Sequence, residues 1–160
     1  MIDKDRKEIL YKEIDLIQSC ISRMSQNSFM VKGWLLSLIA VILALLPENV
    51  NISILCLISF IVIACFWYLD AFFLKIERLY RWKYNWVIMN RLKSEDFIFD
   101  LNPHNSKMWL KSDFINESQN STPILEPCII RVMFTRTLIP LYIPLIILVI
   151  ITYIVNAILR

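Results

Sequence analysis

The chain has 160 residues, of which 58% are hydrophobic and 19% are charged, and its formal net charge is +3. A soluble domain usually holds about 45–50% apolar residues, so this composition argues against an ordinary soluble domain. The net charge is too small and too dispersed to indicate binding to duplex nucleic acid.

The first predicted element is a cytoplasmic amphipathic helix over residues 1–28. Charge is dense in its first half, which argues against a cleavable signal peptide. Its apolar residues step by four, three, four and three: Leu10, Ile14, Ile17, Ile21 and Met24. This spacing indicates a stripe that packs on a neighbouring helix, with lying flat on a lipid surface as the alternative.

Three apolar blocks predict transmembrane helices, which makes the fold an all-α integral membrane protein with a small cytoplasmic helical region. A bilayer core needs roughly 17–25 apolar residues per helix. The second and third uncharged blocks hold 20 and 22 residues, but the first holds 14 and reaches a spanning length only with residues 29–32 included. The predicted spans are residues 29–46, 52–70 and 138–159. Trp34, Trp67 and Tyr68 would then lie at the inner interface.

The cytoplasmic region between the second and third spans is predicted over residues 71–137. The second helix should continue without glycine or proline to Lys93, and the first helix should pack beside this extension. A loop region follows over residues 94–127, with one short strand at 97–99 and one helical turn around 108–114. A helix restarts after Pro127 at the interface and continues into the third span, where we expect a kink at Pro140 and Pro144.

Lysine and arginine counts predict the orientation. Residues 1–32 hold six and residues 75–137 hold ten, whereas the turn between the first two spans holds none. The positive-inside rule therefore places the N-terminus and the central segment in the cytoplasm of a bacterial cell, within its inner membrane, and the C-terminus outside.

The two charges nearest the first two spans are predicted to meet. Pairing these spans as antiparallel helices brings Asp70 level with Ser28, within reach of the Lys32 side chain. We expect Lys32 and Asp70 to form an ion pair, or a polar cluster that includes Asn27, at the inner membrane edge. The alternative is that each charge extends separately to water.

Two further faces are candidates for helix packing or for a pore. Gly33, Ser37, Ala40 and Ala44 lie on one face of the first span, rotated by about 200° from the N-terminal stripe. This small-residue face could pack within the chain, or it could face a second copy or a pore. The third span carries Thr152 and Asn156, spaced i,i+4, which could hydrogen-bond between helices or line an ion path.

The sequence shows no signature of catalysis. It lacks a nucleophile with its base, a carboxylate pair and a glycine-rich phosphate loop, so we expect no enzyme and no cofactor. His104 is the only histidine, and the four cysteines lack metal-ligand spacing, so no metal site is expected. Four basic residues of the cytoplasmic extension could hold an anionic ligand or could be ordinary positive-inside charges: Arg78, Arg81, Lys83 and Arg91.

Two motifs carry a family resemblance. The stretch RMSQNSFMVKGW (residues 23–34), the stretch FWYLDAFFLKIERLYR (residues 66–81) and the proline-containing last span resemble membrane effectors of bacterial antiphage defence, including the Hailong type. The resemblance implies an oligomeric ion channel controlled by a nucleotide signal from a partner nucleotidyltransferase. It also implies an elbow that joins the cytoplasmic helices to the pore helices, formed by Arg23, Asn27, Lys32, Asp70, Glu77 and Arg78.

An ion channel, as the resemblance implies, would have to be a homo-oligomer, since three helices of one chain cannot enclose a water-filled pore. A tetramer in the lipid bilayer is the first expectation, with an oligonucleotide or nucleotide signal as ligand and depolarisation of the cell as the outcome. The alternative is a non-conducting membrane anchor or sensor that recruits a soluble partner through its cytoplasmic helices.

Overall fold

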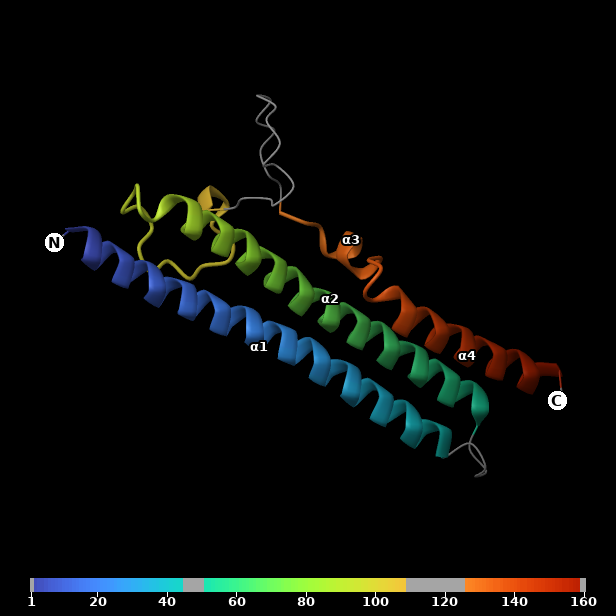
Figure 1. The fold of residues 1–160 in the computed structure, drawn as a ribbon. Helices are drawn as coiled ribbons and strands as arrows, with labels where there is room; N and C mark the ends of the chain where they lie inside the picture. The colour runs from blue at the N-terminus through green and yellow to red at the C-terminus, as the bar shows by residue number, and fades with distance from the viewer. Residues whose placement is uncertain (1, 45–50, 109–125, 159–160) are drawn as a thin grey trace. The chain divides into compact units, whose positions relative to one another are not determined.

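The computed structural model describes residues 2–44, 51–108 and 126–158 of the chain. The described elements are α1 (Ile2–Ala44), α2 (Ile52–Asn90), the 3₁₀ helix η1 (Ser106–Met108), α3 (Ile129–Met133) and α4 (Ile139–Ile158) (Figure 1). The described residues contain no strand. The outer turn at residues 47–50, the outermost residues of the first and third predicted spans, and most of the predicted turn at 108–114 lie outside this part of the chain.

The all-helical fold class is confirmed, and three helices are long and apolar enough to cross a membrane: α1, α2 and α4. In their most apolar windows only 17%, 28% and 11% of the residues are buried inside the protein. The surface of these helices therefore remains largely uncovered by the chain itself. A lipid environment or further copies of the chain would remove it from water.

The chain forms two compact units. Residues 1–25 and 74–127 form the first, which we call the polar unit because it holds most of the charged side chains. Residues 26–73 and 128–160 form the second, which we call the apolar unit. The helices α1 and α2 each contribute one part to each unit.

In the polar unit, α1 packs against α2 through the predicted apolar stripe. Ile17 is 2% exposed and forms a core with Val87 and Met108, and Leu10, Ile14 and Ile21 pack around that core. Met24 packs against a second small cluster on α2. The expected packing of the stripe on the extension of the second helix is confirmed.

The segment after α2 consists of successive turns, and the prediction of a strand at residues 97–99 is wrong. Phe97 and Phe99 both have φ of 55°, the left-handed region that a strand does not use. Asparagine, aspartate and serine side chains accept hydrogen bonds from backbone N–H groups two residues on, at 94–96, 100–102, 102–104 and 105–107. Tertiary contacts to α1, described below, override the alternating pattern that favoured a strand.

The polar unit also holds a charge cluster around Glu126. Lys75 Nζ lies 2.6 Å from Glu126 Oε1, and His104 Nδ1 lies 3.1 Å from the same oxygen. The hydrogen bond from Lys75, opposed by partial burial and assisted by His104, holds the pKa of Glu126 below its usual range. A carboxylate with a lowered folded pKa stabilises the folded state above its unfolded pKa, and this contribution is lost as the pH falls through the folded pKa.

We therefore predict that Glu126→Gln changes the acid dependence of unfolding. The stability difference between the native protein and Glu126→Gln should be less than about 1 kcal/mol, because water screens the pair, and it should shrink as the pH falls through the folded pKa. Thermal unfolding of both proteins across the acidic range measures it. Asp5→Asn, on an exposed part of α1, is the control. A difference that stays constant with pH would contradict the prediction.

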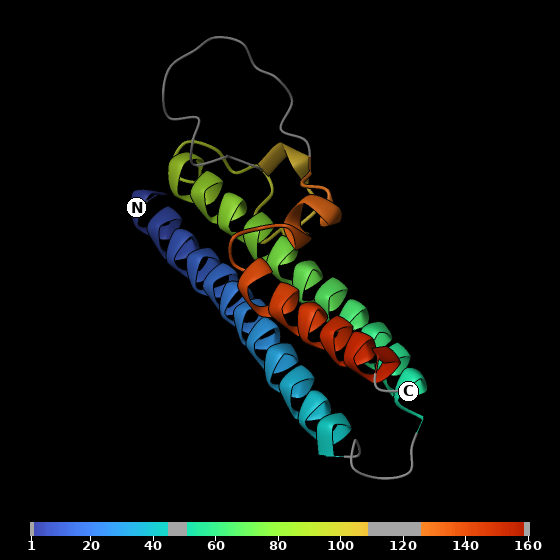
Figure 2. The same cartoon turned by 90° about the vertical axis from the view of Figure 1, so that its right-hand side faces the viewer.

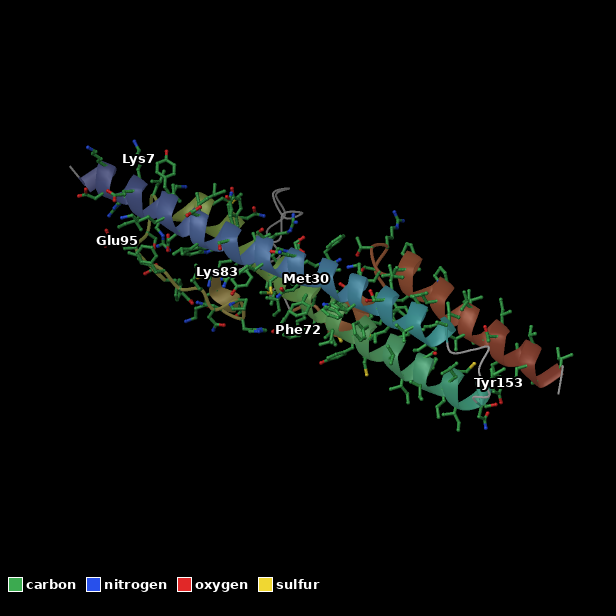
Figure 3. All side chains as sticks on the ribbon, turned by 90° about the horizontal axis from the view of Figure 1, so that it is seen from below. Lys7, Met30, Phe72, Lys83, Glu95 and Tyr153 are labelled. Carbon is green, nitrogen blue, oxygen red and sulfur yellow. The ribbon has the colours of Figure 1, made fainter. Side chains whose placement is uncertain are left out.

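In the apolar unit, α1 and α2 run antiparallel, and α4 runs antiparallel to α2 (Figures 1 and 2). Asn51 caps the start of α2, since its side-chain oxygen accepts a hydrogen bond from the Ser53 N–H at 3.1 Å. Leu35, Ile63 and Leu138 are almost fully buried. Large apolar side chains also remain exposed on every helix, among them Met30, Phe72 and Tyr153, which are labelled in Figure 3.

The predicted restart of a helix after Pro127 is confirmed, but that helix is not continuous with the third span. α3 ends at Met133, and a turn separates it from α4. The Thr135 hydroxyl donates to the Val132 carbonyl at 2.8 Å, and Pro140 has no N–H to continue an α-helical ladder. Pro140 instead lies in the first turn of α4, where a missing donor costs little, and Pro144 lies inside the helix.

Candidate functional site

The candidate site is a buried charge cluster in the apolar unit, built on Asp70 of α2. Asp70 is fully buried, and Lys32 of α1 places its Nζ 2.8 Å from each of the two carboxylate oxygens. Ser28, one turn before Lys32, donates a short hydrogen bond to Asp70 Oδ1. Lys32 Nζ also donates to Ser28 Oγ at 2.7 Å. The predicted ion pair between Lys32 and Asp70 is confirmed, and so is the predicted helix register that places Ser28 opposite Asp70.

The third helix of the unit completes the cluster. Tyr142 of α4 is fully buried, and its Oη lies 3.0 Å from Asp70 Oδ2 and 3.2 Å from the Phe66 carbonyl oxygen. The Tyr142 ring stacks on Trp67, with ring centroids 5.6 Å apart and planes 8° apart. One carboxylate therefore accepts hydrogen bonds from α1 and from α4, so its position depends on the arrangement of all three apolar helices. We call Ser28, Lys32, Asp70 and Tyr142 the Asp70 cluster.

A carboxylate that is fully buried, as Asp70 is, needs all of these hydrogen-bond donors. Removing a charge from water is expensive, and the cost is offset only when the charge is paired and its remaining lone pairs are satisfied. The Lys32 side chain is 28% exposed whereas Asp70 is not exposed at all, so the ion pair is accessible from outside the protein only at Lys32. Rearranging the helices would break contacts to Asp70, which makes the cluster a candidate position for switching between two arrangements.

Sequence reasoning included Asn27 in this cluster, and the structure does not. Within the described residues no hydrogen bond joins Asn27 to Asp70 or Lys32; Ser28 and Tyr142 occupy the available positions instead. Trp67 also departs from its expected place at a lipid interface, since it is 8% exposed and its Nε1 donates to the Met133 carbonyl at 3.0 Å. Trp34 and Tyr68 are exposed, as that expectation requires.

The other predicted elbow residues belong to the polar unit. Arg23 donates to Cys20 Sγ at 3.2 Å. Glu77 is buried and accepts hydrogen bonds from Arg81, four residues on, at 2.6 and 2.9 Å. Arg78 lines an open groove of about 470 Å³. Their role as an elbow stays a prediction.

Half of the predicted anion-binding set is excluded by burial. The Lys83 side chain, labelled in Figure 3, is 1% exposed and donates to the Asn102 carbonyl at 2.9 Å. Arg91 is buried and paired with Glu13. Because neither cation is accessible or free, the prediction that Lys83 and Arg91 bind a ligand is wrong. Arg78 and Arg81 remain, together on the groove, with the remaining lining from Gln18, Ile21, Trp82, Tyr84 and Asn85.

The small-residue face of α1 is not used for packing within the chain. Gly33, Ser37, Ala40 and Ala44 are all exposed, and a Cβ added to Gly33 would meet nothing within 4 Å. The interpretation that this face packs inside the subunit is therefore wrong, because the helix buries Leu35 and Ile39 on its opposite side.

The polar residues of α4 show no bond to another helix. Thr152 donates to the Leu148 carbonyl at 2.9 Å, within its own helix, and it lines a void of about 20 Å³ that Cys56 and Ser59 also line. The side chain of Asn156 is half-buried, and among the described residues it has no hydrogen bond. The prediction of a helix-to-helix hydrogen bond is not confirmed at either residue.

Tyr142 was missed by sequence reasoning, although a signal was present. It is a residue with a hydroxyl group close to the start of an otherwise apolar span, between two prolines. Such a group needs a partner in an apolar environment, and Asp70 is the buried acceptor. The described residues contain no cluster of three or more histidine, cysteine, aspartate or glutamate side chains that could hold a metal ion.

Fold and site together define an all-α chain with three candidate membrane spans, whose helices meet at the Asp70 cluster. Comparison of the chain with family models, with curated proteins and with solved structures finds no match.

Proposed function

We propose that the chain is a membrane effector of bacterial antiphage defence that assembles into a homo-oligomeric ion channel and depolarises the cell. The observation that carries the proposal is the exposed small-residue face of α1. Small residues allow close approach of helix backbones in a membrane, and this face has no partner among the described residues of its own chain. A second copy is the partner that this face fits, and several copies are needed to enclose a pore.

The Asp70 cluster would set the resting arrangement of each subunit. It ties α1, α2 and α4 at one level, so a movement of one helix must exchange the partners of Asp70. Interfaces of this kind tend to have two discrete states rather than a continuum. A nucleotide signal from a partner nucleotidyltransferase would supply the bias, with Arg78 and Arg81 on the groove as its contacts.

We predict that Ala40→Leu prevents assembly and conduction. A leucine on the small-residue face holds the backbones of two copies apart, so the oligomer population should fall by roughly tenfold or more. Native mass spectrometry of the purified protein measures assembly, and a potential-sensitive dye after induced expression measures depolarisation. Val41→Leu, on an exposed and already bulky position, is the matched control and should behave as the native protein does.

Depolarisation with the native chain and with Val41→Leu, but not with Ala40→Leu, would support the channel. A native chain that assembles normally and never conducts would contradict it.

The second candidate is a non-conducting membrane anchor that recruits a soluble partner. The groove in the polar unit favours it, because it exposes Arg78 and Arg81 beside the aromatic residues Trp82 and Tyr84. Cells that keep their membrane potential on induction, together with a partner that co-purifies and is lost in the Arg78→Gln and Arg81→Gln double variant, would favour the anchor.

A further inference from the structure

We call residues 129–138, which comprise α3 and the turn before α4, the connector, and one side of it is packed against the protein. Val132 and Leu138 are 0% and 1% exposed, and Trp67 Nε1 donates to the Met133 carbonyl at 3.0 Å. The ring of Phe134 meets the ring of Trp67 edge-on at 5.2 Å between centroids. These contacts fix which side chains of the connector face outward.

The outward side combines apolar and cationic groups. Ile130 is 62% exposed and Phe134 is 58% exposed, although both are large and apolar. Arg131 and Arg136 are also exposed, and neither forms an ion pair or hydrogen bond within the described residues. Because Lys32 and Asp70 neutralise each other, these two arginines carry the remaining charge of the described apolar unit.

The neighbouring aromatic residues place this surface at one end of the apolar helices. Tyr142, in the first turn of α4, donates a hydrogen bond to Asp70. Tyr68 lies two residues before Asp70 and is 51% exposed, and Trp34 lies two residues after Lys32 and is 67% exposed. Exposed tyrosine and tryptophan side chains at one end of apolar helices are typical of the boundary between hydrocarbon and headgroups.

We infer that Arg131 and Arg136 bind the phosphate headgroup of an anionic phospholipid, with Ile130 and Phe134 inserted beside its acyl chains. The inference rests on the proposed membrane placement of α4. Guanidinium groups bind phosphate oxygens in a bidentate manner, and apolar residues interleaved with arginine are the composition of segments that lie in a membrane surface. Under the predicted orientation the surface faces the cytoplasmic leaflet, where anionic lipids attract basic segments.

The test reconstitutes the full-length protein into nanodiscs of phosphatidylcholine with phosphatidylglycerol and counts retained lipids by native mass spectrometry. The native protein should retain phosphatidylglycerol over phosphatidylcholine by roughly thirtyfold, as two arginines near a charged surface imply. The Arg131→Gln and Arg136→Gln double variant should lose most of this preference. The Arg131→Lys and Arg136→Lys double variant should keep part of it, and Lys4→Gln, an exposed cation of the polar unit, should keep all of it.

Four outcomes would overturn the inference. The first is equal retention of both lipids, and the second is an unchanged preference in the glutamine double variant. The third is displacement of the lipid by millimolar inorganic phosphate, which would assign the surface to a free anion. The fourth is loss of oligomers in the glutamine double variant whether or not the nanodisc contains phosphatidylglycerol, which would assign the surface to contact with a second copy of the chain. A protein that conducts but shows no lipid preference fails only this inference. A protein that salt washing extracts from the bilayer fails the proposed function as well.

Discussion

Replacing Arg91 by methionine should lower the free energy of unfolding of the polar unit by about 3–5 kcal/mol, because the Glu13 carboxylate would remain buried without its partner. Glu13 is 3% exposed and Arg91 is 2% exposed. Arg91 Nη2 donates to Glu13 Oε1 at 2.9 Å, and its Nε donates to Oε2. The pair joins α1 to the residue that directly follows α2.

The same pair positions the loop after α2, which adds to the expected loss. Arg91 Nη1 donates to the Asp96 carbonyl at 2.7 Å, and Nη2 donates to the Phe97 carbonyl at 3.2 Å. Glu13 Oε1 accepts the Phe99 N–H at 2.7 Å. The two charges therefore bond to the backbone on both sides of Ile98, which accounts for the left-handed conformation at Phe97 and Phe99.

Hydrogen exchange of the amides in residues 94–101, together with thermal unfolding, measures the effect. Arg6→Met is the matched control, since it removes an arginine from the exposed pair with Glu95 and should cost less than about 1 kcal/mol. The double variant Glu13→Leu with Arg91→Met should be less destabilised than either single variant, because it leaves no buried charge unpaired. Equal losses for Arg91→Met and Arg6→Met would contradict the argument.

The pairing of the two long helices could be predicted from sequence because one pattern runs through both units. The stripe Leu10, Ile14, Ile17, Ile21 and Met24 continues in phase through Ser28 and Lys32 to Leu35 and Ile39, and the structure buries its members Ile17, Ser28, Leu35 and Ile39. A helix that keeps one phase keeps one packing face. The register of α1 against α2 comes from counting inward from the short turn between the two spans, and it places Asp70 within reach of Lys32, where the structure has the ion pair.

The buried charges of the polar unit could have been found by the same rule. Lys83 and Arg91 share the stripe of α2 that includes Ile76, Leu79 and Val87, and Glu13 lies four residues before Ile17 on α1. A charge within a packing stripe is either paired or exposed by a local change in packing. Because Lys83 and Arg91 were interpreted only as charges that orient the chain in the membrane or bind an anion, the possibility that each is buried and paired was missed.

Tyr142 and the loop at residues 97–99 could not be fixed by local patterns. Apart from Thr152 and Asn156, α4 is apolar around its whole circumference, so no apolar periodicity indicates which side of the helix packs on α2, and the partner of Tyr142 was unknown without coordinates. The alternation of residues 97–99 is that of a strand, but a three-residue pattern is weak against a buried ion pair that bonds to its backbone.

Asp70→Asn is expected to destabilise the apolar unit by about 3–5 kcal/mol, because the substitution removes the charge that pairs with Lys32 in a water-poor environment. Asparagine keeps the shape of the side chain but turns one acceptor oxygen into a donor, which faces the donors Lys32 and Ser28 or Tyr142. Thermal unfolding in detergent measures the loss, which should appear as a lower midpoint for the apolar unit.

Two further variants separate the charge from the hydrogen bonds. Tyr142→Phe removes the hydrogen bond from an uncharged hydroxyl to the charged Asp70 carboxylate and leaves the ion pair, so it should cost about 1.5–3 kcal/mol. Lys32→Met combined with Asp70→Asn removes both charges and should recover much of the loss seen with Asp70→Asn alone, since no unpaired charge then remains in the cluster. Lys12→Gln, which breaks the exposed pair with Glu8, is the matched control. If the double variant unfolded as readily as Asp70→Asn, the unpaired Lys32 charge would not be the cause of the loss, and the argument from charge pairing would be contradicted.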